Sequence, residues 1–146
     1  KFESIDPEWP VTLSEKFLKD ILRADLRYQK IIISDDLDMK ALRNNYSVDQ
    51  IAVRALQAGC DMLLYCNEFE VPPQAIEAVN KAINDGVLNS DDIRQSLDRV
   101  SSVKKRALRE PDPPPMSEAA KLIGHPDHLK VAKAIQTGDI PEDLAT

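Results

Sequence analysis

Hydrophobic and polar residues alternate along this chain with two different periods, which together predict helices interleaved with strands. From Leu13 to Leu26, apolar side chains return every three or four residues, the spacing of one helical face. Residues 12–15 (Thr-Leu-Ser-Glu) match a capping box and predict where that helix begins. Three consecutive isoleucines follow at 31–33, and an unbroken β-branched run is typical of a strand buried on both faces of a parallel sheet. We therefore expect a helix followed by a strand over 30–34.

The same order repeats once, and two further helices follow it. A second capping box at 47–50 (Ser-Val-Asp-Gln) and Gly59 bound a helix, and an apolar run predicts a strand over 62–66. Pro72 opens a third helix, and Ser90 is the expected cap of a fourth. The apolar faces expected on these last two helices consist of Ile76, Val79, Ile83, Ile93, Leu97, Val100 and Val103.

Strands that alternate with helices predict right-handed crossovers and an α/β fold with a parallel sheet. Only two strands are evident, and two parallel strands can neither cover four helices nor satisfy their own outer edges. One interpretation is a mostly helical chain with a minimal sheet. The interpretation we favour is part of a larger α/β barrel or sheet, since a complete (β/α)8 barrel typically needs ~250 residues.

A proline-rich run divides the chain. Residues 111–115 (Pro-Asp-Pro-Pro-Pro) predict an extended, semi-rigid spacer. We expect residues 1–110 to form the main domain. Residues 116–146 are expected to form a helical tail, which is too short for a core of its own and packs on the main body or on a partner.

Composition narrows the possible partners. The 146 residues carry 19 Lys and Arg against 25 Asp and Glu, a net charge of −6 that argues against nucleic-acid binding. No apolar run approaches the ~20 residues of a membrane-spanning helix, so we expect no membrane partner. The first residues do not resemble a secretory signal, and the chain does not begin with Met, so we expect a processed or truncated product. Cys60 and Cys66 are expected to be free, buried thiols in a cytoplasmic, reducing compartment.

Acidic side chains follow the first predicted strand, where α/β proteins gather their catalytic groups. Asp35, Asp36 and Asp38 lie there, and 67–68 (Asn-Glu) hold the equivalent place after the second strand. Carboxylates at such a point can bind a divalent metal, accept a phosphoryl group or attack an electrophilic carbon. Equally, an Asp pair after a strand can be a helix cap or a solvated turn. His125 and His128, the only histidines, are interpreted as surface residues rather than proton shuttles.

Four stretches together resemble a known family: residues 9–14 (Trp-Pro-Val-Thr-Leu-Ser), 21–23 (Ile-Leu-Arg), 33–39 (Ile-Ser-Asp-Asp-Leu-Asp-Met) and 55–64 (Ala-Leu-Gln-Ala-Gly-Cys-Asp-Met-Leu-Leu). Over residues 5 to about 105 the chain is similar to the family 3 glycoside hydrolases, and within them to the bacterial β-N-acetylglucosaminidases of peptidoglycan recycling. The Ser-Asp-Asp-Leu-x-Met block after an apolar strand is the most specific part of the resemblance.

The resemblance implies a (β/α)8 barrel and a retaining exo-hydrolase that releases terminal β-linked N-acetylglucosamine from peptidoglycan fragments. The first Asp of the block, Asp35, would be the nucleophile, and Met39 would line the sugar pocket. Residues 30–34 would be the seventh barrel strand and 62–66 the eighth. Asp36 is expected to orient or cap rather than to catalyse, and we expect no metal and no cofactor.

The chain also departs from the family pattern. The family carries its acid/base His in a Lys-His-x-x-Gly-His-Gly loop, which is absent here, and neither His125 nor His128 matches it. Residues 26–30 (Leu-Arg-Tyr-Gln-Lys) replace the usual Leu-Gly-Phe-x-Gly turn. We therefore expect the C-terminal part of the barrel domain, inactive alone and paired with the missing N-terminal part or with a second copy.

Two other functions stay open. A phosphate-accepting receiver domain also places paired Asp residues after a strand, but it needs a further Asp and a Lys at later strand ends. Here the second strand ends in Cys66 and Asn67. The other function is a non-catalytic binding or assembly module in which Asp35 is a relic. The glycosidase interpretation requires the isoleucine strand to deliver Asp35 to the mouth of a barrel, shielded from bulk water.

Overall fold

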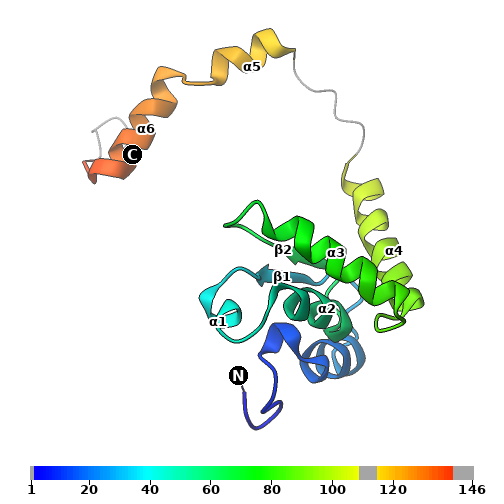
Figure 1. Ribbon diagram of the computed structural model, residues 1–146. Helices are drawn as coiled ribbons and strands as arrows, with labels where there is room; N and C mark the ends of the chain where they lie inside the picture. Colours follow the sequence, from blue (N-terminus) through cyan, green and yellow to red (C-terminus); the bar gives the residue numbers. More distant parts are fainter. Residues whose placement is uncertain (1, 109–114, 140–146) are drawn as a thin grey trace. The chain divides into compact units, whose positions relative to one another are not determined.

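The computed structural model describes residues 2–108 and 115–139, and the chain divides into two compact units, 1–108 and 109–146. The first unit is an α/β fold with two parallel strands and mostly helices (Figure 1). Its elements in order are a 3₁₀ helix Val11–Leu13, a π-helix Lys16–Asp25, β1 Ile33–Asp36, α1 Lys40–Arg43, α2 Val48–Ala58, β2 Met62–Leu64, α3 Val71–Asn84 and α4 Ser90–Ala107. The predicted order is confirmed, with α1 as an unpredicted addition.

The first helix begins differently from the prediction, because its capping residues have other partners. Ser14 Oγ donates to the Asp6 carboxylate and accepts the Phe17 N–H at 3.4 Å, while Glu15 pairs with Arg54 at 2.9 Å. The capping box expected at 12–15 is therefore wrong. The corresponding box at Ser47 is confirmed, since Ser47 and Gln50 each accept the other's backbone N–H.

Strand β1 begins three residues later than predicted. Arg23 donates to the carbonyls of Tyr28 at 2.9 Å and Lys30 at 2.6 Å, and Tyr28 Oη donates to the Ile31 carbonyl at 3.1 Å. These carbonyls thus bond to side chains instead of to a neighbouring strand. As a result, Asp35 and Asp36 form the last two positions of β1 rather than the turn after it.

The two strands pair in parallel with one irregularity. Ile33 is opposite Met62 and Asp36 is opposite Leu64, so β1 has one residue more than β2 between the paired positions. Ser34 Oγ accepts the Leu64 N–H at 2.9 Å inside this interval. Such a bulge bends a strand and re-aims its side chains, and bulges are frequent beside active sites.

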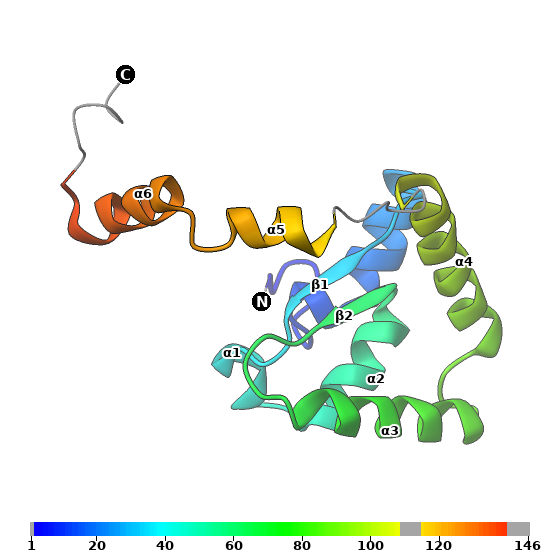
Figure 2. The ribbon, with the colours of Figure 1, turned by 90° about the horizontal axis from the view of Figure 1, so that it is seen from above.

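Helix α2 and its neighbours cover one face of the strands, as Figure 2 shows. Gly59 ends α2 with a φ of 115°, a left-handed conformation that favours glycine. The core beneath the helices contains Ile32, Leu37, Ile51 and the fully buried alanines of α2. On α3 and α4, Ile76 and Leu97 are about 60% exposed (62% and 60%), so the expected apolar faces are only partly covered by the described residues.

The other face of the sheet is open. Ile33, Met62 and Leu64 are 56%, 38% and 43% exposed, because no described element of the first unit faces them. The prediction that the isoleucine strand is buried on both faces is therefore wrong for this chain, although Ile32 is buried. A two-stranded sheet with helices on one side leaves its second face to solvent.

A buried carboxylate ties the start of the sheet to two helices. The side chain of Asp61 is fully buried and accepts hydrogen bonds from Arg23 at 2.6 Å, from Arg99 at 2.9 Å and from Ser96 at 2.8 Å. It also accepts the Ile32 N–H at 2.8 Å. Burial alone raises the pKa of Asp61, but these hydrogen bonds and the Arg99 charge outweigh it and hold the pKa below its usual value.

The second unit contains α5 Met116–Leu122 and α6 Pro126–Thr137. His125 caps α6 by accepting the Asp127 N–H at Nδ1, 3.3 Å away. Of the predicted spacer at 111–115, the first four residues lie outside the described residues. No helix in the described part of the chain is long and apolar enough to span a membrane.

Candidate active site

The segments that follow the two strands come together at one edge of the sheet, as predicted from parallel pairing. Leu37 N–H donates to the Leu64 carbonyl at 2.9 Å, which continues the ladder beyond β1. Asn67 Nδ2 donates to Asp36 Oδ2 at 2.7 Å. The aspartate segment 35–38 and the Asn-Glu pair at 67–68 therefore form one polar cluster.

Two of the three aspartates in this cluster are occupied by contacts within the protein. Asp36 accepts the N–H groups of Asp38 at 3.0 Å and Cys66 at 3.1 Å, in addition to Asn67. The Asp38 side chain is only 4% exposed and lies 3.5 Å from Arg43, and it accepts the Glu68 N–H at 3.5 Å. Both carboxylates thus fasten one loop to the other.

Asp35 differs from its two neighbours. Among the described residues, its carboxylate accepts one hydrogen bond, from the Asp36 N–H at 2.8 Å, and the residue is exposed. It shares the open side of β1 with Ile33, two positions earlier. Asp35 is therefore the aspartate of the cluster that remains available to an outside group.

The exposure of Asp35 corrects the expectation that the barrel mouth shields it. Shielding would require side chains opposite the inner face of β1, and the described residues of the first unit place none there. The position of Asp35 follows the alternation of the strand, since Ile33 and Asp35 are exposed, whereas Ser34 is buried and Asp36 bonds to the segment after β2.

Met39 lies beside this cluster, at the residue that precedes α1. Its N–H donates to the Asp36 carbonyl at 3.3 Å, and its carbonyl accepts the N–H groups of Leu42 and Arg43. Met39 is 39% exposed, so it is accessible from solvent as a residue lining a binding pocket would be. Its predicted contact with a sugar stays a prediction.

The negative charge of the cluster acts on two neighbouring side chains. Burial and the charge of Asp38 raise the pKa of Tyr65 to about 12, and the buried Tyr65 hydroxyl has no hydrogen-bond partner among the described residues. Partial desolvation, followed by the charges of Asp36, Asp38 and Asp35, raises the pKa of the Cys66 thiol. Both thiols are free as predicted, but Cys66 is exposed rather than buried.

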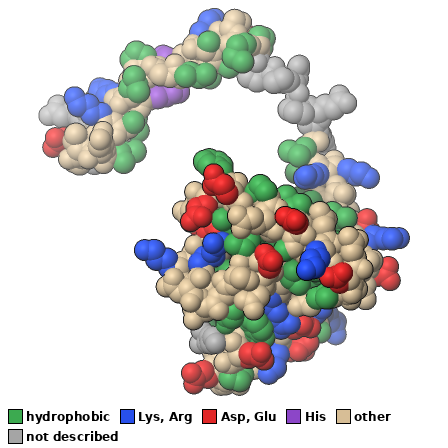
Figure 3. Space-filling view, in the orientation of Figure 1, with side chains coloured by type: hydrophobic (Ala, Val, Ile, Leu, Met, Phe, Trp, Pro, Cys, Tyr) green, Lys and Arg blue, Asp and Glu red, His purple; other side chains and the backbone are tan. Residues whose placement is uncertain are grey.

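The remaining candidate groups have other surroundings within their own units. His125 and His128 belong to the second unit, with ring centroids 5.5 Å apart, and His125 acts there as a helix cap. In the described part of the chain, no three His, Cys, Asp or Glu side chains are placed to hold a metal ion. The viewed face of the first unit mixes acidic and basic side chains rather than presenting a basic surface (Figure 3).

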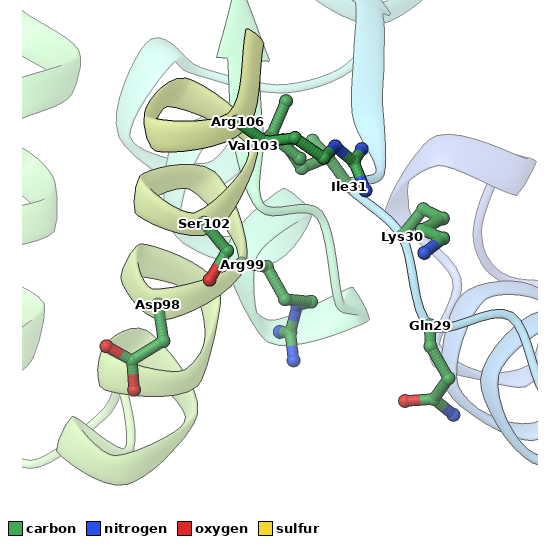
Figure 4. A pocket seen from close by; sticks show the side chains of 8 residues that line it. All are labelled: Gln29, Lys30, Ile31, Asp98, Arg99, Ser102, Val103 and Arg106. Atoms are coloured by element: carbon green, nitrogen blue, oxygen red, sulfur yellow. The ribbon is translucent and has the colours of Figure 1, made fainter. Parts of the chain in front are cut away.

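A pocket of about 260 Å³ opens at the opposite end of β1, between α4 and residues 29–31 (Figure 4). Lys30, Arg99 and Arg106 contribute its cations, and Asp98 is its one acidic residue. The Arg99 guanidinium is already bound to Asp61. This pocket lacks the paired carboxylates of a glycosidase, and in α/β barrels catalysis occurs at the other end of the strands.

Sequence reasoning found the acidic cluster and expected different roles for Asp35 and Asp36, but it did not find the contacts that separate them. Neither the bulge nor the bond between Asp36 and Asn67 has a signal in residue spacing. The one available indication was that neighbouring side chains leave a strand in opposite directions, which favoured different roles for Asp35 and Asp36.

Comparison with known proteins shows which family the chain resembles. Residues 1–103 match the model of the glycosyl hydrolase family 3 N terminal domain. A beta-hexosaminidase of Nitrosomonas eutropha is 49% identical over 67 residues, 46% of this chain and 19% of the relative. One of Photobacterium profundum is 40% identical over 90 residues, 60% of this chain and 27% of the relative. The chain therefore spans about a fifth to a quarter of the length of these relatives.

Solved structures agree with the sequence matches. A beta-N-acetylglucosaminidase from Thermotoga maritima superimposes with a TM-score of 0.66 and 34% identity, covering 70% of this chain and 22% of that one. A family 3 beta-N-acetylglucosaminidase from a Paenibacillus species superimposes with a TM-score of 0.69 and 30% identity, covering 71% and 20%. The fold of the first unit is thus that of part of a family 3 TIM barrel.

Proposed function

Because the chain belongs to glycosyl hydrolase family 3, we propose that it supplies the nucleophile of a β-N-acetylglucosaminidase, and that Asp35 is this nucleophile. The observation that supports the assignment is the division of roles among the three aspartates. Asp36 and Asp38 each hold the loop after β2, whereas Asp35 accepts a single local hydrogen bond and faces the open side of the strand.

The proposed reaction is a retaining hydrolysis in two steps. An Asp35 oxygen attacks the anomeric carbon while an acid group protonates the departing glycosidic oxygen, so that one C–O bond forms as another breaks. Water then attacks the glycosyl ester and returns Asp35 as a carboxylate, giving up its proton to the same acid/base group. The Asp36 N–H, 2.8 Å from Asp35 Oδ1, keeps the attacking carboxylate oriented.

The proposed substrates are fragments of peptidoglycan that end in β-linked N-acetylglucosamine. Support for the sugar comes from the relatives, which are named beta-hexosaminidase or beta-N-acetylglucosaminidase. The peptidoglycan source rests on the sequence resemblance. Met39, exposed beside the cluster, is the proposed wall of the sugar pocket.

The proposed partner is the rest of the barrel. Two parallel strands leave unpaired edges and an apolar inner face, and Ile33, Met62 and Leu64 on that face are each more than a third exposed. Closing the barrel would cover these side chains and bring an acid/base group opposite Asp35. A second copy of this chain would cover the same surface without supplying that group.

Two alternatives are less well supported. A receiver domain needs its paired acidic side chains free for magnesium, and here the Asp36 carboxylate is occupied by three N–H donors. A non-catalytic module would keep the fold without turnover, and the next experiment separates it from the hydrolase.

We expect the full-length protein to release the chromophore from an aryl β-N-acetylglucosaminide, and the isolated 146 residues to show no turnover above the uncatalysed rate. The reason is that attack by Asp35 needs a partner that protonates the leaving oxygen. An aryl β-glucoside serves as the specificity control. Turnover by the isolated chain would contradict the need for a partner, and binding without turnover by the full-length protein would favour the non-catalytic module.

A further inference from the structure

A set of side-chain hydrogen bonds joins the ends of β1 and β2, which we name the Asp36 clamp. Asp36 Oδ1 accepts the N–H groups of Asp38 at 3.0 Å and Cys66 at 3.1 Å, and Oδ2 accepts Asn67 Nδ2 at 2.7 Å. We propose that Asp36 is a positioning residue, and that its clamp to Asn67 sets the direction of the Asp35 carboxylate. This inference rests on the proposed function of Asp35.

The clamp replaces backbone pairing where the strands can no longer provide it. Strand β2 ends at Leu64, and the Leu64 N–H donates to Ser34 Oγ in the bulge rather than to a backbone carbonyl of β1. The last backbone bond between the two segments runs from the Leu37 N–H to the Leu64 carbonyl. After it, the next N–H on the segment that follows β2 to bond across to the β1 segment is that of Cys66. The Asp36 carboxylate accepts it, so a side chain continues the connection between the strands.

The clamp reaches Asp35 through the backbone. The Asp36 carboxylate is fixed by three donors, and the Asp36 backbone N–H donates to Asp35 Oδ1 at 2.8 Å. If the Asp36 side chain rotated out of the clamp, the peptide unit between Asp35 and Asp36 would lose its support. Asp35 would then lose both its donor and its direction toward the open face, and a misplacement of about 1 Å at a reacting group costs about 10²-fold in rate.

The chemistry of the clamp predicts a specific rescue. Asp36→Asn keeps the size of the side chain but puts an amide NH₂ opposite the NH₂ of Asn67, so the pair loses its bond to a carboxylate and re-forms only as a neutral bond once the Asn67 amide turns over. Exchanging the two groups in the double variant Asp36→Asn/Asn67→Asp again gives one donor and one acceptor, while the oxygen at position 36 still accepts from the backbone.

The test compares kcat, KM and the melting temperature of these variants in the full-length protein. Asp36→Asn is expected to lower kcat about 10- to 100-fold with KM changed by less than about twofold, and the double variant is expected to recover most of the loss. Ser96→Ala, which removes a bond to Asp61 far from the cluster, is the matched control and should lower the melting temperature without lowering kcat. Wild-type kcat in Asp36→Asn, or no recovery in the double variant, would overturn the proposal.

A second measurement separates this proposal from the proposed function. In the 146-residue chain, amide hydrogen exchange at Cys66 is expected to become about 10-fold faster or more in Asp36→Ala, because its acceptor is gone. Unchanged exchange would show that the clamp does not exist, whatever the activity. If Asp35→Asn instead retains turnover, the nucleophile assignment falls, and the positioning role falls with it even where the exchange result shows a clamp.

Discussion

Replacing Asp35 with asparagine is expected to lower kcat of the full-length protein on an aryl β-N-acetylglucosaminide by at least on the order of 10³-fold. The substitution preserves the shape of the side chain and its bond from the Asp36 N–H, but an amide cannot form the glycosyl ester. Because Asp35 is exposed and makes one local bond, its loss should leave folding unchanged.

The control for this variant is Asp49→Asn, an exposed carboxylate in the first turn of α2. It removes the same charge from the chain and should retain wild-type kcat. Steady-state kinetics on both variants, with circular dichroism to show equal folding, provide the comparison. Turnover within about tenfold of wild type in Asp35→Asn would reject this residue as the nucleophile.

Replacing Asp61 with alanine is expected to produce the largest loss of stability, about 3 kcal/mol in the free energy of unfolding. The variant leaves Arg23 and Arg99 without their buried partner, and it removes the acceptor of the Ile32 N–H where β1 begins. Removing one partner of a buried ion pair usually costs about 3–5 kcal/mol. The lower end applies here because the two arginine side chains are 17% and 26% exposed. Urea unfolding of the 146-residue chain, followed by circular dichroism, measures the change.

Asp98→Ala is the matched control on α4, since it removes an exposed carboxylate one residue from Arg99 and should change stability by less than about 0.5 kcal/mol. Ser96→Ala removes a single donor to Asp61 and should cost about 1 kcal/mol. An Asp61→Ala protein as stable as Asp98→Ala would contradict a structural role for this carboxylate.

The pH dependence of stability follows from the same group. Folding lowers the pKa of Asp61, so the unfolded chain binds its proton at a higher pH than the folded chain does. The stabilisation is therefore complete above the ordinary aspartate pKa of about 3.9 and is lost as pH falls below that value toward the folded pKa. Asp61→Ala, which lacks this group, should accordingly lose less stability than wild type as the pH falls from neutral to below about 3.9.

Local sequence patterns predicted the elements whose formation is decided locally. Helix α2 has its capping box at Ser47 and its left-handed Gly59, and both were readable because the residues lie within one turn of the helix ends. The two strands and their parallel pairing followed from the alternation of elements. The positions of the acidic residues directly after the strands then placed the acidic cluster at the carboxyl edge of the sheet.

The features that escaped prediction depend on partners far away in sequence. The start of β1 is set by Arg23 and by Asp61, which lies 29 positions from Ile32 along the chain. The contacts that distinguish Asp36 from Asp35, a bulge and a bond to Asn67, 31 positions away, could not be predicted. Shielding of Asp35 failed as an expectation because it depends on side chains opposite β1, which the described residues of the first unit do not include.

The most direct test of the nucleophile assignment is to trap the glycosyl-enzyme. The full-length protein would be treated with a 5-fluoro N-acetylglucosaminyl fluoride, which forms the ester faster than water cleaves it, and then digested and mapped by mass spectrometry. We expect one labelled peptide, with the sugar on Asp35 and with no label in Asp35→Asn. A sugar on Asp36, on Asp38 or on any residue outside β1 would contradict the account.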